Sequence, residues 1–139
     1  ELDLQSLTPA DAVRRIVEFT FDYHEAHPDF IRLVSIENIH HGRHLVQSER
    51  LRNTNLPVMQ TLDGILRRGR RSGGFRADID PIDLLMLISA FCFFRVSNRH
   101  TFGALFGCDL TAPELRRKHK HMIGDAVVAL LQSNGPKRR

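Results

Sequence analysis

The chain has 139 residues, of which 42% are hydrophobic and 26% charged, as is typical of one globular domain with its own core. No apolar run approaches the roughly 20 residues that a transmembrane helix needs, and no secretory signal pattern opens the chain. The two cysteines do not suggest a disulfide framework, so a cytoplasmic location is expected. The net charge of +4 lies in local clusters and does not indicate a stripe for nucleic acid.

The N-terminal third predicts two helices divided by a proline. Thr8-Pro9 supplies a cap and a first-turn proline, and apolar residues follow at helical spacing. This helix should end near His27, because the residue before a proline is biased out of the helical region. A second helix should begin at Pro28, and Gly42 suits the position just after its end.

The middle of the chain predicts a short helical connection over residues 43–52, followed by a helix from Leu56 to about Arg71. Asn53-Thr54-Asn55 offers side chains that can cap this helix, and Gly73-Gly74 stops it. Apolar residues recur along it at helical spacing.

The next helix begins at Asp80-Pro81 and is the most apolar stretch of the chain. From Ile82 to Phe94 only Asp83 and Ser89 are polar. A helix without a solvent-facing side must be covered all round, and so short a chain can cover only part of it. The pattern therefore indicates a partner chain, a cavity, or both.

The rest of the chain also reads as helix. The apolar helix runs to about Arg99, a shorter one follows and ends at Gly107, and a last amphipathic helix begins at Pro113. No segment shows the alternation and hairpin turns of strands. We therefore predict an all-α fold, a bundle of five to six helices over residues 1–134, with a tail at 135–139.

Clusters of metal-binding and charged residues have structural explanations. Glu37, His40 and His44 have a spacing that could hold zinc, but Gly42 should end the helix between the two histidines, so no metal site is expected. The arginine run at 67–71 suits the C-terminal end of a helix, where cations offset the dipole.

The cations at 116–120 lie early in the last helix, where the dipole disfavours them, which indicates pairing with acids elsewhere. Asp80 and Asp83 are interpreted as a cap and a first-turn residue rather than a catalytic pair. Because no nucleophile, base or phosphate-binding loop forms an enzyme motif, we predict neither catalysis nor a cofactor.

Two phrases of the sequence are distinctive when taken together. One is G-x-F-R-x-D-x-D-P-x-D-L over Gly73–Leu84, and the other is F-G-x-D-L over Phe106–Leu110. With them, and with segments 27–45 and 55–69 in the same order, the chain resembles the C-terminal effector domain of TetR-family transcriptional regulators. The resemblance covers nearly the whole chain.

The resemblance implies a homodimer that binds an unknown small-molecule effector, while a separate N-terminal helix-turn-helix domain binds operator DNA. That DNA-binding domain is missing from this chain, so the chain alone is not expected to bind an operator specifically. The effector would bias the dimer toward one helix packing and so change the spacing of the two DNA-reading heads.

Two adjacent apolar helices from each chain can form a four-helix bundle across a two-fold axis. The candidates for this dimer seam are Leu85, Ile88, Cys92, Ile123, Val127 and Leu131. A pocket between helices is mostly apolar with a few polar groups. The candidate lining residues are Phe19, Tyr23, Ile39, Met59, Leu62, Phe91 and Phe94, with Asn38, His41, Arg95 and Asn98 as polar groups.

The sequence therefore predicts the effector-sensing and dimerisation domain of a TetR-like regulator, a repressor in our interpretation. The alternative is a helical protein-interaction or metal-sensing module without a small-molecule cavity. A continuous apolar cavity among the first four helices would favour the first hypothesis, and a filled core would favour the second.

Overall fold

The computed structural model describes residues 3–47 and 56–135, and every regular element within them is a helix. The first four are α1 (Pro9–Ala26), α2 (Pro28–Ile39), α3 (Arg43–Val46) and α5 (Leu56–Arg71). They are followed by α6 (Pro81–Ser97), α7 (Arg99–Phe106) and α8 (Pro113–Gln132). The all-α prediction is confirmed. The described residues hold seven helices, because part of the expected connection forms a helical turn of its own at α3.

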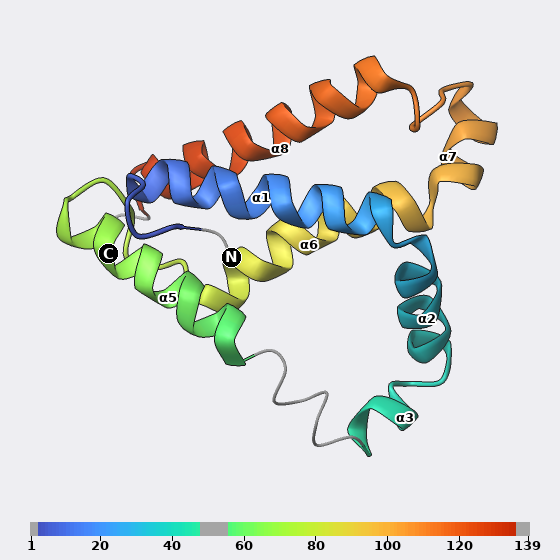
Figure 1. Cartoon of the computed structure of the whole chain (residues 1–139), viewed down its shortest axis with the longest axis horizontal. Coiled ribbons are helices and arrows are strands. Elements are labelled where there is room, and N and C mark those ends of the chain that lie inside the picture. The colour runs from blue at the N-terminus through green and yellow to red at the C-terminus, as the bar shows by residue number, and fades with distance from the viewer. Residues whose placement is uncertain (1–2, 48–55, 136–139) are drawn as a thin grey trace.

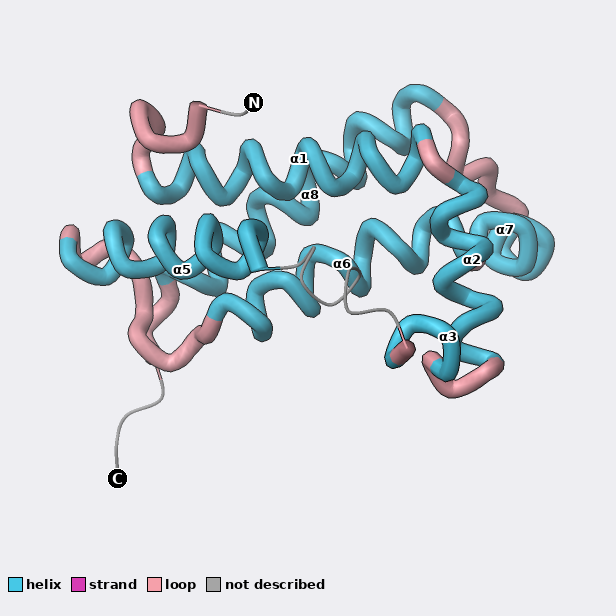
Figure 2. The backbone as a smooth tube through the Cα atoms, turned by 60° about the horizontal axis from the view of Figure 1, so that its bottom comes forward, coloured by secondary structure: helices cyan, strands magenta, loops and turns pink. Residues whose placement is uncertain are grey.

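α1 is the central helix of the fold. It packs lengthwise against α8 and also contacts α6 and α5 (Figure 1). Figure 2 shows α5 alongside α1, with α2, α3 and α7 gathered at the other end of the molecule. The predicted apolar helix, α6, contacts five other helices: α1, α2, α5, α7 and α8.

One hydrophobic core joins α1, α5, α6 and α8. Each fully buried large aliphatic or aromatic side chain contributes about 1.5–3 kcal/mol relative to an exposed one. The buried residues of this core from those four helices are Ala12, Val13, Val17, Phe21, Leu62, Ile65, Leu66, Leu84, Ile88, Cys92, Ile123, Val127, Val128 and Leu131.

The helix ends follow the capping pattern of the sequence. The Thr8 hydroxyl accepts a hydrogen bond from the Asp11 amide at 3.2 Å, and the Asp80 amide donates to the Asp83 carboxylate at 3.0 Å. Gly42 adopts the left-handed conformation, with φ of 69°, at the predicted end of the second helix. The predicted cap at Asn53-Thr54-Asn55 lies outside the described residues.

The cations at the start of α8 find acidic partners on α1. Lys120 pairs with Asp22 at 2.5 Å, and Arg116 pairs with Glu25 at 3.5 Å. These pairs explain how α8 tolerates cations at its N-terminal end, because the acids of the neighbouring helix offset the unfavourable dipole interaction.

No single helix in the described part of the chain is long and apolar enough to cross a membrane. Only α6 and α7 taken together reach that length and composition, and they are bent by 70° at their junction.

Gly69 lies on α5 where the ring of Phe75 packs directly over the helix backbone. A Cβ built on Gly69 would overlap that ring, whereas a Cβ on Gly64 of the same helix meets no atom within 4 Å. Phe75 is buried in the core, so its ring has little freedom to move aside.

We expect Gly69→Ala to destabilise the fold by about 1–3 kcal/mol, because the added methyl group overpacks the Phe75 contact. Gly64→Ala is the matched control and should stabilise the fold by about 0.5–1 kcal/mol through helix propensity alone. Urea denaturation of both variants measures the two free energies of unfolding. Equal effects in the two variants would contradict the overpacking.

His24 is a buried histidine in an aromatic setting. Its ring lies 6.2–6.3 Å from the rings of Tyr23, Phe30 and Phe93. Its Nδ1 atom has no hydrogen-bond partner in the described structure. Burial lowers the pKa of His24, and a hydrogen bond with the Cys92 backbone only partly offsets this.

A histidine with a lowered folded-state pKa makes the fold less stable as the pH falls below 6.5, because the unfolded chain takes up a proton that the folded chain resists. We expect the free energy of unfolding to fall more between pH 7.5 and 5 in the parent chain than in His24→Gln. The pKa of His119 is also lowered, but His119 is present in both proteins and cancels in the comparison. Parallel pH profiles from urea denaturation would contradict this assignment.

Candidate functional site

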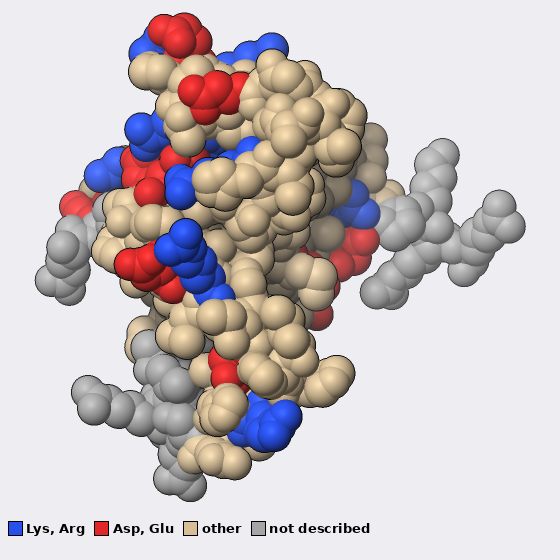
Figure 3. Space-filling view, turned by 90° about the vertical axis from the view of Figure 1, so that its right-hand side faces the viewer, with Lys and Arg blue, Asp and Glu red and all other residues tan. Residues whose placement is uncertain are grey.

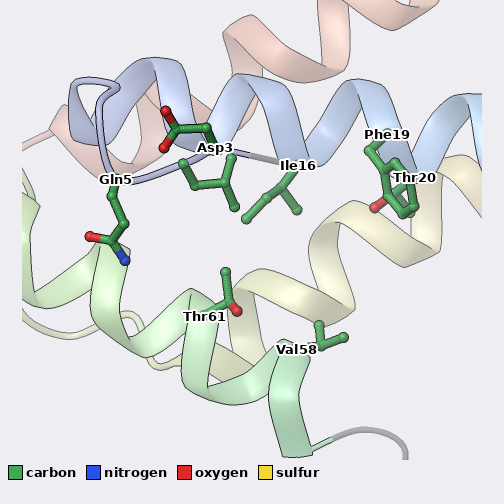
Figure 4. A pocket seen from close by; sticks show the side chains of 8 residues that line it. Asp3, Gln5, Ile16, Phe19, Thr20, Val58 and Thr61 are labelled. Carbon is green, nitrogen blue, oxygen red and sulfur yellow. The ribbon is translucent and has the colours of Figure 1, made fainter. Parts of the chain in front are cut away.

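The larger of the two grooves that we describe lies between α1 and α5. It has a volume of about 960 Å³ and is open to solvent. Figure 4 shows Ile16 of α1 pointing toward α5, where Val58 and Thr61 lie on the facing helix. The remaining lining residues of the groove are Asp3, Leu4, Gln5, Phe19 and Thr20. The groove is mostly apolar with a few polar groups, as expected of a small-molecule site.

The third wall of this groove is the segment that precedes α1. Arg68 of α5 holds that segment in place by donating to three backbone carbonyls: Leu4 at 2.9 Å, Gln5 at 2.9 Å and Leu7 at 3.2 Å. One guanidinium thus ties the N-terminal wall to the α5 wall. The carboxylate of Asp3 lies at this end, where hydrogen bonds from Ser6 lower its pKa.

Two of the predicted lining residues, Phe19 and Tyr23, lie on the side of α1 that faces the groove or continues from it. Phe19 lines the groove and is 52% exposed. Tyr23 lies one turn further along, with its ring stacked on that of Phe19 at 6.1 Å and on that of His27 at 4.1 Å. Phe30 of α2 meets Tyr23 edge-on at 5.9 Å. An exposed aromatic row therefore leads from the groove toward α2.

The structure does not bring the other predicted lining residues together. Leu62 is in the core, and Met59 is half-buried on α5 without lining the groove. Asn38 donates to the Val34 carbonyl of its own helix at 3.0 Å, and Ile39 is 72% exposed beside it. His41 occupies the turn after α2 with a positive φ of 58°.

Three more of the predicted lining residues lie around the C-terminal end of α6. Phe91 packs against the ring of His119 at 5.9 Å, and Phe94 packs against Phe102 of α7 at 6.0 Å. Asn98 forms the junction of α6 and α7, where its carbonyl accepts from the Phe102 amide at 2.8 Å. None of these residues borders the α1–α5 groove.

Arg95, the predicted cationic lining group, is instead a buried structural cation. It pairs with Glu25 of α1 at 3.1 Å and donates to the Leu110 carbonyl at 2.6 Å. It also contacts the His119 ring nitrogen and lies over the ring of Phe21, 4.9 Å from its centroid. A buried guanidinium requires such partners, which leaves it unavailable to a ligand in the groove.

The predicted dimer seam requires a correction, because most of it faces inward. Leu85 is half-buried and packs on the core. The other five residues belong to the core of the chain itself: Ile88, Cys92, Ile123, Val127 and Leu131. The helical period identified the apolar residues of α6 and α8 but not which face points outward.

The outward faces of α6 and α8 carry a different set of small and apolar residues. On α6, Leu87 is 37% and Phe94 48% exposed, and Ala90 lies exposed between them. On α8, Met122 is 44% exposed, and it shares one face with the exposed residues Ala126 and Ala129. The two helices meet at the Phe91–His119 contact, which lies beside both rows.

Two further groove residues on α1 have a sequence signal. Ile16 precedes Phe19 by three residues and Thr20 by four, so the helical period places these side chains along one side of α1. Residues 3–5 have no periodicity, and only the Arg68 contacts place them beside the groove.

The histidines form no metal centre in the described residues. Glu37 is buried and accepts hydrogen bonds from the His44 ring at 2.5 Å and from the Leu45 amide at 3.2 Å. Across residues 3–47 and 56–135, no three His, Cys, Asp or Glu side chains gather closely enough to hold a metal ion. Glu37 thus serves to hold the α2–α3 turn.

The comparisons with known proteins can be set beside this geometry. Residues 9–127 match the family model described as tetracyclin repressor-like, C-terminal domain. The chain is 32% identical over 128 residues to the HTH-type transcriptional repressor NicS of Pseudomonas putida, an alignment covering 92% of this chain and 60% of NicS. The chain therefore spans less than two thirds of the length of this relative. Because the family match covers most of an all-helical chain, this chain belongs to the tetracyclin repressor-like C-terminal domain family of TetR-type transcriptional regulators.

Proposed function

We propose that this domain senses a small-molecule effector in the α1–α5 groove and dimerises through the outward faces of α6 and α8. The observation that carries the proposal is the groove itself, because it is open, largely apolar and about 960 Å³ in volume. Such a volume lies at the upper end of the range of about 300–1,000 Å³ for small-molecule sites. Members of this family are regulators rather than enzymes, which agrees with a site built for binding alone.

The support for dimerisation is an apolar surface that the chain leaves uncovered. Leu87, Phe94 and Met122 are large hydrophobic side chains exposed on two neighbouring helices. Ala126 and Ala129 keep the α8 face thin, which allows close approach of a second helix. Two copies related by a two-fold axis would bury these rows against each other in a four-helix bundle.

The groove also suggests how the effector signal would leave the domain. One of its walls is the segment 3–5, which Arg68 ties to α5 and which leads directly into α1. In a longer regulator, an effector that favours one position of this wall would shift the DNA-reading heads by its differential affinity for the two positions. We propose that the whole protein represses transcription, as the name of NicS states for that relative.

The groove hypothesis predicts that Thr61→Phe weakens effector binding by filling part of the groove from α5. Small metabolites are screened by thermal shift against the parent chain, since a ligand that binds only the folded state raises its melting temperature. Compounds that stabilise the parent chain should lose at least about tenfold in affinity with this variant.

The matched control is Gln60→Phe, one position earlier on α5, because Gln60 is exposed and does not line the groove. Its affinities, measured by calorimetry, should equal those of the parent chain. Equal binding by Thr61→Phe and the parent chain would move the effector site elsewhere.

The dimer hypothesis predicts that Ala126→Glu converts a dimer into a monomer at micromolar concentration. A carboxylate on this face would be buried without a partner, which costs several kcal/mol. Sedimentation equilibrium measures the mass of the particle. Ala77→Glu in the loop before α6 places the same charge on another exposed alanine and should remain dimeric. A parent chain that is monomeric at high concentration would contradict the hypothesis.

A further inference from the structure

A second groove lies at the other end of the molecule, between α2 and the junction of α6 and α7. It has a volume of about 400 Å³. Figure 3 looks onto this end, where charged side chains lie scattered over a largely uncharged surface. The α1–α5 groove lies toward the opposite end of the bundle. The two grooves have no lining residue in common.

The inner part of this groove is apolar. Ile31 of α2 and Val96 of α6 line it and are 1% and 7% exposed, and Pro28 and Ile36 flank them on α2. The hydroxyl of Ser35 donates to the Ile31 carbonyl at 2.9 Å, so its proton is already used within α2. The groove therefore offers an apolar surface to the body of a ligand.

The rim of the groove carries two arginines. Arg32 and Arg99 line it beside His100, and no Asp or Glu is among its lining residues. Arg32 pairs with Asp29 at 3.6 Å, but both side chains are highly exposed, and exposed pairs of this kind contribute little. Arg99 donates to the neighbouring His100 ring at 3.3 Å, and no carboxylate in the described residues pairs with it.

We propose that this groove binds a small amphipathic anion, namely a short aliphatic carboxylate. Its chain would lie against Ile36, which is 51% exposed, above the buried floor that Ile31 and Val96 form. Its carboxylate would meet the guanidinium of Arg99, with Arg32 on the facing helix. A guanidinium presents parallel N–H donors that match the two oxygens of a carboxylate. The volume of about 400 Å³ is near the lower end for ligand sites and so selects a short chain.

Octanoate is the probe for this proposal, titrated into the intact chain by isothermal calorimetry. Octan-1-ol has the same tail without the charge, and acetate has the charge without the tail. Octanoate should bind at least about tenfold more tightly than either, because octan-1-ol lacks the charge that pairs with the guanidinium and acetate lacks the chain that covers the apolar floor. Octan-1-ol binding as tightly as octanoate would overturn the proposal, since the cationic rim would then select nothing.

Variants locate the site. Arg99→Gln should weaken octanoate binding by roughly tenfold through loss of the charged donors. Arg15→Gln removes a guanidinium from an exposed pair on α1, away from the groove, and should bind octanoate as the parent chain does. Circular dichroism melting curves of both variants confirm that each is folded. Unchanged affinity of a folded Arg99→Gln would overturn the proposal.

A third variant separates the two grooves. Thr61→Phe fills the α1–α5 groove and should leave octanoate binding unchanged. If Thr61→Phe abolishes octanoate binding and Arg99→Gln does not, octanoate occupies the α1–α5 groove. That result would overturn this proposal while supporting the effector site of the proposed function, so the two failures are distinguishable.

Discussion

The fold depends on how the almost wholly apolar helix α6 is covered by its neighbours. α6 buries Leu84, Ile88 and Cys92 in the core, and burial raises the pKa of the Cys92 thiol to about 12, so this thiol stays protonated. A second flank, at Val96, meets α2. The third flank, at Leu87 and Phe94, is only partly covered, because Phe102 of α7 packs against Phe94 and both side chains stay 37–48% exposed. The core, the small groove and the proposed dimer face are thus different sides of the same helix.

Arg95 is a buried cation within this apolar helix, and it requires ion-pair and hydrogen-bond partners from neighbouring elements. A buried guanidinium without partners is strongly destabilising, by about 3–5 kcal/mol when one member of a pair is removed. Glu25 of α1 and the carbonyl of Leu110 supply those partners, and Glu25 also pairs with Arg116 at the start of α8. One carboxylate of α1 therefore pairs with both α6 and α8. In the sequence Arg95 is a polar residue on an apolar helix. That pattern fits a ligand-binding group and a buried structural cation equally well.

Local chemistry predicted the helices well because caps, prolines and glycines act within a few residues. Pro28 and Gly42 bracket α2 as predicted, and the second half of the expected connection lies outside the described residues. Which face of a helix points outward was harder to predict. A helix that is apolar on two sides has the same hydrophobic period whichever of these sides faces the core. Ile88 and Val127 therefore fitted a dimer seam as well as a core. The wall at residues 3–5 depends on Arg68, a contact between residues more than 60 apart in the chain.

The contacts of α1 are unequal, and this inequality bears on how a ligand in the groove would act. Toward α8, α1 is tied by Arg14–Asp125, Asp22–Lys120 and Glu25–Arg116 in addition to apolar packing. Toward α5, the groove separates the α1 residues Ile16–Thr20 from Val58 and Thr61 of α5. Arg68 of α5 bonds to the segment before α1 rather than to α1 itself. A ligand that widens the groove would therefore displace α5 and residues 3–7 more readily than α8. The α8 part of the proposed dimer face would then keep its position on α1 while the wall of the groove moved, and any displacement of α5 would reach the dimer face through its packing on α6.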